Sequence, residues 1–364
     1  MWKLVSCRLV TKTGEKRFKD SCRLNLEERN MIEVSKKRLK FLDDAKGLGM
    51  MMIVWMHIWG NNTFEFAPPE LLNSYITGIY VPLFFVLSGY LVRIERVNIE
   101  NDIKKKVKSV LRPFLVVYLF SFISSFFLSV MGIGTKHDFE WGNVFNPIFS
   151  KSFFNGPLWF LLALFWAFVF FYTIITLCRG KAHIISIASL AFGCIGFYLS
   201  RTGVTLPLFM GQGAVACPML MMGCMIKKYI GDQLVKNKWL ATSVLFLGIL
   251  IYVLLRMGIS MQDNAYNGFY LQFLFGVLGG SMAVLCFTII FEKWLPFVEY
   301  WGKYSLVVLC FHNFVLIPCA RIAGKLIHQP IIWALATFLV VYLCFKFIIP
   351  VISKYTPSLF NIKT

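Results

Sequence analysis

DDAKGLGMMMIVWMHIW, residues 43–59, begins with charged side chains, turns apolar and then carries a histidine within the apolar run. Lys46 and His57 are eleven residues apart, almost three whole turns, so an α-helix places both side chains on one face. The rise between them is roughly 16 Å, about half of a ~30 Å hydrocarbon layer. The stretch predicts a membrane helix with Lys46 at one surface and His57 near the midplane. An ionisable side chain at that depth is a functional candidate, and a neutral packing histidine is the alternative.

Composition extends this reading to the whole chain. Of the 364 residues, 58% are hydrophobic and 15% are charged, which is typical of a polytopic membrane protein and excludes an ordinary soluble domain. The sequence therefore predicts an all-α membrane protein with about ten transmembrane helices. The expected spans are residues 44–60, 71–92, 111–131, 158–178, 183–200, 207–226, 239–255, 269–291, 301–319 and 331–352.

The basic residues predict the orientation of these spans. If the N-terminus is cytoplasmic, 30 of the 37 lysines and arginines fall on the cytoplasmic side and 6 on the outer side. This asymmetry predicts that both termini are cytoplasmic. We expect a basic tail over residues 1–40, a membrane domain over 41–353 and a short cytoplasmic tail over 354–364. Met31 is a second plausible translation start.

The net charge of +19 follows from this topology and does not require nucleic acid as a partner. Basic loops set topology and meet the anionic headgroups of membrane lipids. The densest group, Lys104–Lys106 with Lys108 and Arg112, lies beside the expected membrane surface. It is a candidate for holding phosphates as well as for setting topology.

Cysteine and histidine usage limits the chemistry. The ten cysteines include no C-x-x-C pair, so the sequence predicts neither a metal site nor a disulfide framework. Of the five histidines, only His57 and His312 fall inside predicted spans, at similar depth. No Asp or Glu lies well inside a span. A Ser-His-Asp triad and the membrane carboxylates typical of coupled transporters are therefore missing.

Three further stretches add polar or aromatic groups to the spans. They are VPLFFVLSGYLV (81–92), GPLWFLLALFW (156–166) and WGKYSLVVLCFHNF (301–314). Ser88 and Gly89 suit close helix packing, and Trp159 suits either an interfacial belt or a platform for a sugar ring. Interhelical hydrogen bonding is the plain alternative for Tyr304, Ser305, His312 and Asn313.

Taken in order, these stretches resemble the acyltransferase-3 family of integral membrane acyltransferases over about residues 38–350. Each motif alone is weak, and the ordered set is specific. The matching positions are Leu42-Asp43-Asp44-Ala45-Lys46-Gly47 with His57, Phe84-Phe85-Val86-Leu87-Ser88-Gly89-Tyr90-Leu91, Arg112-Pro113, Trp159-Phe160-Leu161, and Gly302 to Ser305 with His312. Residues 162–170 carry no acid, which resembles the W-F-L branch that acetylates capsule and other exported polysaccharides.

The resemblance implies transfer of an acyl group, usually acetyl, from cytoplasmic acyl-CoA to a hydroxyl of a cell-envelope glycan. It implies a multi-pass protein of the bacterial inner membrane that uses acetyl-CoA as substrate and has no bound cofactor. His57 is the expected catalytic residue, as general base or as transient acyl carrier. The implied donor or substrate contacts are Lys46, Ser88, Tyr90, Arg112, Trp159, Tyr304, Ser305, His312 and Asn313. The implied structural positions are Asp43, Gly47, Gly89 and Gly302, with Asp43 either an N-cap or a partner of Lys46.

Two other classes of function stay open at this point. A transporter or flippase for a lipid-linked sugar would use the same basic inner face and ten spans, although the chain shows no internal repeat. An assembly component that binds partners through the basic tail is the third reading.

Overall fold

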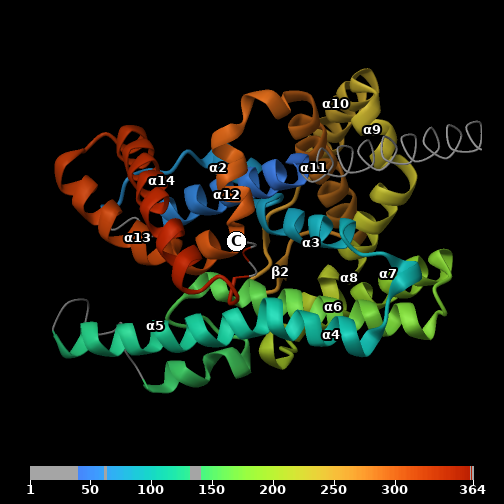
Figure 1. Cartoon of the computed structure of the whole chain (residues 1–364), viewed down its shortest axis with the longest axis horizontal. Helices are drawn as coiled ribbons and strands as arrows, with labels where there is room; N and C mark the ends of the chain where they lie inside the picture. The colour runs from blue at the N-terminus through green and yellow to red at the C-terminus, as the bar shows by residue number, and fades with distance from the viewer. Residues whose placement is uncertain (1–39, 61–63, 132–140, 361, 363–364) are drawn as a thin grey trace, which may run out of the picture.

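The computed structural model describes residues 40–60, 64–131, 141–360 and 362, and these residues are almost entirely helical (Figure 1). In chain order, the helices are residues 40–60, α2 (Glu70–Thr77), α3 (Tyr80–Tyr90), α4 (Ile99–Lys106), α5 (Arg112–Val130), α6 (Trp159–Leu177), α7 (Ala182–Arg201), α8 (Met210–Met225), α9 (Asp232–Lys236), α10 (Lys238–Leu255), α11 (Tyr270–Phe291), α12 (Pro296–Lys303), α13 (Ser305–Leu326) and α14 (Pro330–Tyr355). The described strands are β1 (Ile259–Ser260) and β2 (Ala265–Tyr266), which form one antiparallel hairpin.

The prediction of an all-α polytopic membrane protein is confirmed. Nine helical stretches of the described residues are long and apolar enough to cross a membrane. They are Glu70–Tyr90, Ile99–Val130, Gly156–Leu177, Ala182–Arg201, Pro207–Lys236, Lys238–Leu255, Tyr270–Phe291, Ser305–Leu326 and Pro330–Tyr355. Each corresponds to one predicted span, and the remaining prediction, 44–60, lies within the helix over residues 40–60.

Two regions predicted as basic loops, 93–112 and 227–238, are largely helical. Figure 1 shows α4 and α5 as one long helix, joined by the π-helical turn Val107–Leu111. A second π-helical turn, Ile226–Gly231, continues α8 in the same way. The helix at α4 begins because Asn98 accepts a hydrogen bond from the Asn101 amide, a helix N-cap. The prediction was wrong here because a charged helical turn has no apolar period to reveal it.

Two predicted spans contain a break. The second is divided into α2 and α3 around Gly78 and Ile79. The predicted span 301–319 begins inside α12, and Tyr304, at φ −109° and ψ 25°, separates α12 from α13. The break lets α12 and α13 take different directions while the chain stays continuous.

The C-terminal residues fold back onto the helices. α14 runs to Tyr355, beyond the predicted end of the membrane domain at residue 353. Leu359 and Phe360 are buried, and the Phe360 ring lies 5.9 Å from the Phe311 ring of α13. The part of the expected cytoplasmic tail that the structure describes is packed against the fold.

The helices divide into a central and a peripheral set. α8 and α11 are mostly buried, whereas α7 and α10 bury only a small share of their apolar windows. The peripheral helices expose large apolar side chains such as Phe246 and Leu254 of α10 and Phe347 of α14. Apolar side chains that face outward on long helices are expected where lipid replaces water as the solvent.

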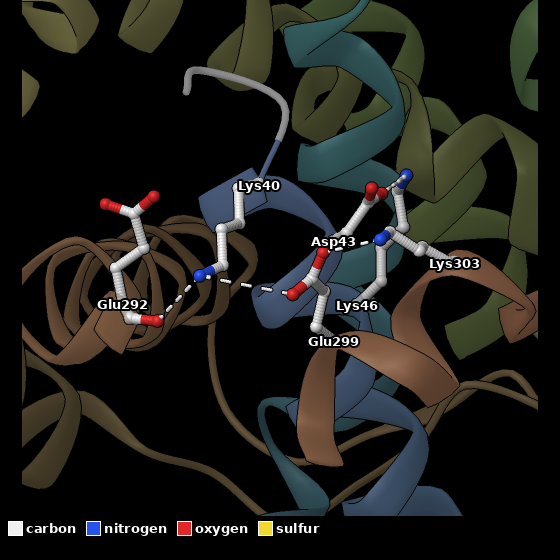
Figure 2. A network of polar contacts seen from close by, with 6 residues as sticks. All are labelled: Lys40, Asp43, Lys46, Glu292, Glu299 and Lys303. Carbon is white, nitrogen blue, oxygen red and sulfur yellow. Dashed lines mark hydrogen bonds and ion pairs between the residues drawn. The ribbon is translucent and has the colours of Figure 1, made fainter. Parts of the chain in front are cut away.

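The helix over residues 40–60 is fixed to α12 by two glycines. A Cβ on Gly302 would collide with the backbone oxygen of Asp43, and one on Gly47 would collide with that of Val298. Ion pairs surround this contact (Figure 2): Lys303 lies 2.6 Å from Glu299, and Lys40 lies 4.0 Å from it. The hydrogen bond to Glu299 raises the pKa of Lys303, which precedes the span formed by α13. Backbone proximity, with charges around it, therefore sets the position of the first helix.

Replacing Gly302 by alanine is expected to destabilise the protein by about 1–3 kcal/mol, because the new Cβ forces the two backbones apart. The matched control is Gly60→Ala, since no atom lies within 4 Å of the Cβ position at Gly60. The measurement is the thermal unfolding midpoint in detergent. Equal midpoints for the two variants would contradict the role assigned to this contact.

Candidate active site

The two histidines of the spans are in contact. The rings of His57 and His312 lie 4.9 Å apart between centroids, in an edge-to-face arrangement at 77°. His312 is fully buried and His57 is partly exposed. His57 lies three residues before Gly60, the last described residue of its helix, while α13 continues fourteen residues beyond His312.

The hydrogen bonds of the two imidazoles define their tautomers. His57 Nδ1 lies 3.0 Å from the Ile53 oxygen, and His312 Nδ1 lies 2.9 Å from the Val308 oxygen. Because a backbone carbonyl oxygen only accepts hydrogen bonds, each contact requires a proton on Nδ1. A neutral ring then carries its lone pair on Nε2. His312 Nε2 is buried and has no hydrogen-bond partner in the described part of the chain.

His57 lines a cavity of about 80 Å³. Most of its wall is apolar or aromatic, and Thr77, Tyr80, Ser260 and Gln262 add hydroxyl and amide groups. A concave apolar site with a few polar groups is the usual form of a small-molecule site. The lining residues are Ile53, His57, Thr77, Tyr80, Val81, Pro82, Phe84, Pro157, Trp159, Phe160, Ile259, Ser260, Met261, Gln262 and Leu309.

The β1–β2 hairpin forms one wall of this cavity. Its strands pair Ile259 with Tyr266 and Ser260 with Ala265. The turn is held in place through Gln262. Its backbone oxygen accepts a hydrogen bond of 2.9 Å from the Gln212 side chain, and its own amide nitrogen donates one of 2.9 Å to Ser152. A segment between α10 and α11 is thereby fixed beside His57.

Asn155 connects α13 to α5 through side-chain hydrogen bonds. It is buried, and its amide nitrogen donates hydrogen bonds to the Cys310 oxygen at 2.9 Å and to Ser121 Oγ at 3.3 Å. Its Oδ1 is buried without a hydrogen-bond partner among the residues described. Asn155 therefore connects α5 and the start of α6 to the turn of α13 just before His312.

Of the predicted contact residues, the structure brings His312 and Trp159 to His57. His312 touches the ring, and Trp159 lines the same cavity together with Phe160. Asn313 follows His312, and its Oδ1 is buried with no partner among the described residues. His312 and Trp159 therefore lie around His57.

The other predicted contacts lie elsewhere. Lys46 Nζ is paired with Asp43 Oδ1 at 3.0 Å (Figure 2). Asp43 is therefore the partner of Lys46, and it is not an N-cap because the helix already includes residue 40. Tyr90 is buried, with its ring 5.9 Å from that of Phe41.

The last four predicted positions are likewise outside the His57 cavity. Arg112 is exposed at the start of α5. Tyr304 and Ser305 form the junction of α12 and α13, with the Tyr304 ring 5.4 Å from Tyr300. Ser88 lines a second cavity at the other end of α3. Next to it, Gly89 lets α3 approach the backbone of Leu220 in α8, where no Cβ would fit.

Sequence reasoning missed Thr77, Tyr80, Asn155 and Gln262. The only available signal was the position of Asn155, directly before Gly156-Pro157 and Trp159. Gln262 gave none, because the loop over residues 256–268 looks like an ordinary connection between spans. Its approach to His57 is a tertiary contact.

The family comparison covers most of the chain. A family model described as an acyltransferase domain matches residues 39–349. The chain belongs to the acyltransferase-3 family. Neither the curated proteins nor the solved structures that were searched gave a match. The matched range begins just before the helix that carries His57 and includes both histidines.

Membership in the acyltransferase-3 family makes this chain a multi-pass membrane acyltransferase. The acyltransferase domain includes every residue that lines the His57 cavity. It also includes the Gly302–Asp43 contact that fixes the first helix.

Replacing Asn155 by alanine should destabilise the protein by about 1–3 kcal/mol, because the buried Cys310 oxygen loses its side-chain donor. Ser121→Ala is the matched control: its bond to Asn155 is long, at 3.3 Å, and its own hydroxyl bonds to the Val117 oxygen of the same helix. We expect a clearly smaller shift for the control in thermal unfolding in detergent. If Ser121→Ala lowered the unfolding midpoint more than Asn155→Ala, the supporting role assigned to Asn155 would be wrong.

Labelling from outside tests the predicted orientation. With both termini cytoplasmic, the hairpin residue Ser260 faces the outer side, so Ser260→Cys should react with a membrane-impermeant maleimide in intact cells. Lys238→Cys, at the start of α10, should react only after the cells are opened. The signal is compared with that of the parent protein, which carries native cysteines. If Lys238→Cys reacted in intact cells and Ser260→Cys did not, the orientation would be opposite to the predicted one.

Proposed function

We propose that this acyltransferase moves an acyl group, acetyl in the simplest case, from cytoplasmic acyl-CoA to a hydroxyl of a cell-envelope or exported saccharide. The observation that carries the proposal is His57: its ring touches His312 and lines a cavity with aromatic, hydroxyl and amide groups. Aromatic faces and hydrogen-bonding side chains together suit a sugar ring. The bacterial inner membrane is the proposed location.

The tautomer supports a base role for His57. With the proton on Nδ1, Nε2 is the atom that accepts a proton from the acceptor hydroxyl. The hydroxyl oxygen forms its bond to the acyl carbon, the carbon–sulfur bond breaks, and the CoA thiolate takes the proton from the imidazolium. In the covalent variant, Nε2 itself attacks the thioester and the carbon–sulfur bond breaks. The acyl group then passes from the ring to the hydroxyl, whose proton goes to the CoA thiolate. Both routes use the same nitrogen.

The aromatic wall favours the W-F-L branch. Trp159 and Phe160, the first two residues of that motif, both line the His57 cavity. The tryptophan ring is buried and is held between Phe160 and Phe209, at 6.3 and 5.9 Å. A fixed indole beside the base can position one face of an acceptor sugar. This supports a saccharide as the acceptor, the class of substrate that the branch acylates.

His57→Ala should lower acyl transfer by about 10²–10⁴-fold, the usual contribution of a positioned acid or base. The assay follows label from acetyl-CoA to a glycan acceptor with purified protein in detergent. His183→Ala is the matched control, because His183 is exposed near the start of α7 and lines neither cavity.

Equal transfer by wild type and His57→Ala would reduce His57 to a packing residue. If the wild type consumed no acyl-CoA with donor and glycan supplied, the result would favour the transporter instead. A transporter does not consume acyl-CoA, whereas an acyltransferase does so even in detergent, where no gradient exists.

A further inference from the structure

The connection between α5 and α6 contains a short apolar helix. It is a 3₁₀-helix of nine residues, Trp141–Phe149. Its sequence, WGNVFNPIF, carries no charged side chain and includes three aromatic residues. With both termini cytoplasmic, as predicted, this connection lies on the outer side of the membrane. A loop surrounded by water would normally carry charged and polar side chains, so the composition of this helix needs another explanation.

The helix has one row of side chains that faces the protein and one that faces outward. A 3₁₀-helix has three residues per turn, so side chains three residues apart lie in one row. Pro147 is buried and Val144 is half-buried, and these two form the inner row. Phe145 and Ile148 form the next row and are exposed, Phe145 to 59%. Phe149 is exposed as well. The outward side of the helix is therefore apolar.

The helix runs back along α5. Trp141, its first residue, packs against Phe122 and Phe126, with ring centroids 5.8 and 6.0 Å away. Three residues later, the Val144 oxygen accepts a hydrogen bond of 2.7 Å from the Tyr118 hydroxyl. Tyr118 precedes Phe126 by eight residues, about 12 Å along α5. The chain thus returns beside α5 toward the start of that helix.

The residues after the 3₁₀-helix continue in the same direction. Phe153 is buried, and its ring lies 5.4 Å from Tyr118 and 6.3 Å from Phe114, in the first turn of α5. α5 belongs to the helical stretch Ile99–Val130, which is long and apolar enough to cross a membrane. A segment that accompanies such a helix over most of its length shares the surroundings of that helix.

The polar groups of this connection form hydrogen bonds within the protein. Asn146 donates from its side-chain amide to the Ser152 oxygen at 2.6 Å and to Asn143 Oδ1 at 2.9 Å. The Asn146 oxygen in turn accepts a bond of 2.9 Å from the Lys151 amide. Irregular backbone at membrane depth is tolerated where the protein satisfies its polar groups. The connection meets this condition on the side that faces the helices.

We propose that the 3₁₀-helix is a membrane-contact segment, and that Phe145, Ile148 and Phe149 lie in the hydrocarbon of the bilayer. Bilayer lipid is the occupant because the helix packs on α5, whose own outer half exposes Phe127 and Leu128. The apolar surface of the segment therefore continues the lipid-facing surface of a spanning helix. The absence of charge in residues 141–149 fits hydrocarbon better than lipid headgroups.

The segment is also connected to the His57 cavity. Ser152 Oγ accepts a hydrogen bond of 2.9 Å from the side-chain amide of Gln262, which lines that cavity. The backbone oxygen of Ser152 is the one bound by Asn146. Two hydrogen bonds thus connect a wall of the cavity to a helix that the bilayer holds. This connection exists whichever reaction the cavity performs.

Photocrosslinking in nanodiscs tests the contact. The full-length protein carries p-benzoylphenylalanine in place of Phe145, and lipid adducts are measured by intact-protein mass spectrometry after irradiation in phosphatidylcholine nanodiscs. The positive control places the probe at Phe246 of the spanning helix α10, which is 65% exposed. The negative control places it at Glu100, whose charged side chain is 73% exposed at the start of α4. Lipid adducts at Phe145 should lie within about twofold of those at Phe246 and exceed those at Glu100 at least about fivefold.

Three outcomes would overturn the proposal. An adduct yield at Phe145 no higher than at Glu100 would place the helix in water. A covalent dimer in place of lipid adducts would make this face an interface between two copies of the chain. Adducts that form with phosphatidylglycerol but not with phosphatidylcholine would indicate a headgroup contact in place of hydrocarbon. Each variant is first checked by its thermal unfolding midpoint, and Ile148 is the second probe position if the Phe145 variant does not fold.

Discussion

The position of His57 depends on a backbone contact at the other end of its helix. Gly302 lies against the Asp43 oxygen with no room for a side chain, which fixes the helix over residues 40–60 to α12. The chain then turns at Tyr304 and continues as α13, so the same contact also sets where His312 lies. Almost four turns separate Asp43 from His57, and a helix transmits position over that length because it is stiff. The pair of histidines is thus aligned from one end, where ion pairs of Lys40 and Lys303 with Glu299 surround the contact (Figure 2).

The features that the sequence predicted are those that depend on local hydropathy or on helical spacing. The apolar spans appear where expected, and Lys46 meets Asp43 because they are one turn apart. The charged turns of α4 were missed, since their helix is stabilised by an N-cap and by pairs such as Lys104 with Glu100. The partners of His57 depend on tertiary packing. Nothing in residues 256–268 indicates that Gln262 lies in the His57 cavity, and only the ordered family motifs suggested that His312 and Trp159 matter.

Some of the buried polar atoms without partners lie on or beside the part of α13 that carries His312. Asn155 Oδ1, His312 Nε2 and Asn313 Oδ1 all lack a hydrogen-bond partner among the residues described. Each such atom costs about 1–3 kcal/mol relative to a satisfied one, and inside a membrane no bulk water is present to lower that cost. Packing alone would favour apolar side chains at these positions. Polar groups at that depth are better explained by a function than by packing, which supports the role proposed for His57.

α3 and α6 each line two cavities whose walls differ in chemistry. At one end they meet the hairpin, His57 and aromatic walls, and at the other they border four basic side chains. Between these ends the two helices pack through phenylalanine rings, with Phe85 and Phe160 5.1 Å apart between centroids. The two helices thus separate an aromatic environment from a basic one. The glycine contacts of Gly89 with α8 hold α3 in that place, so the separation is a property of the packed fold.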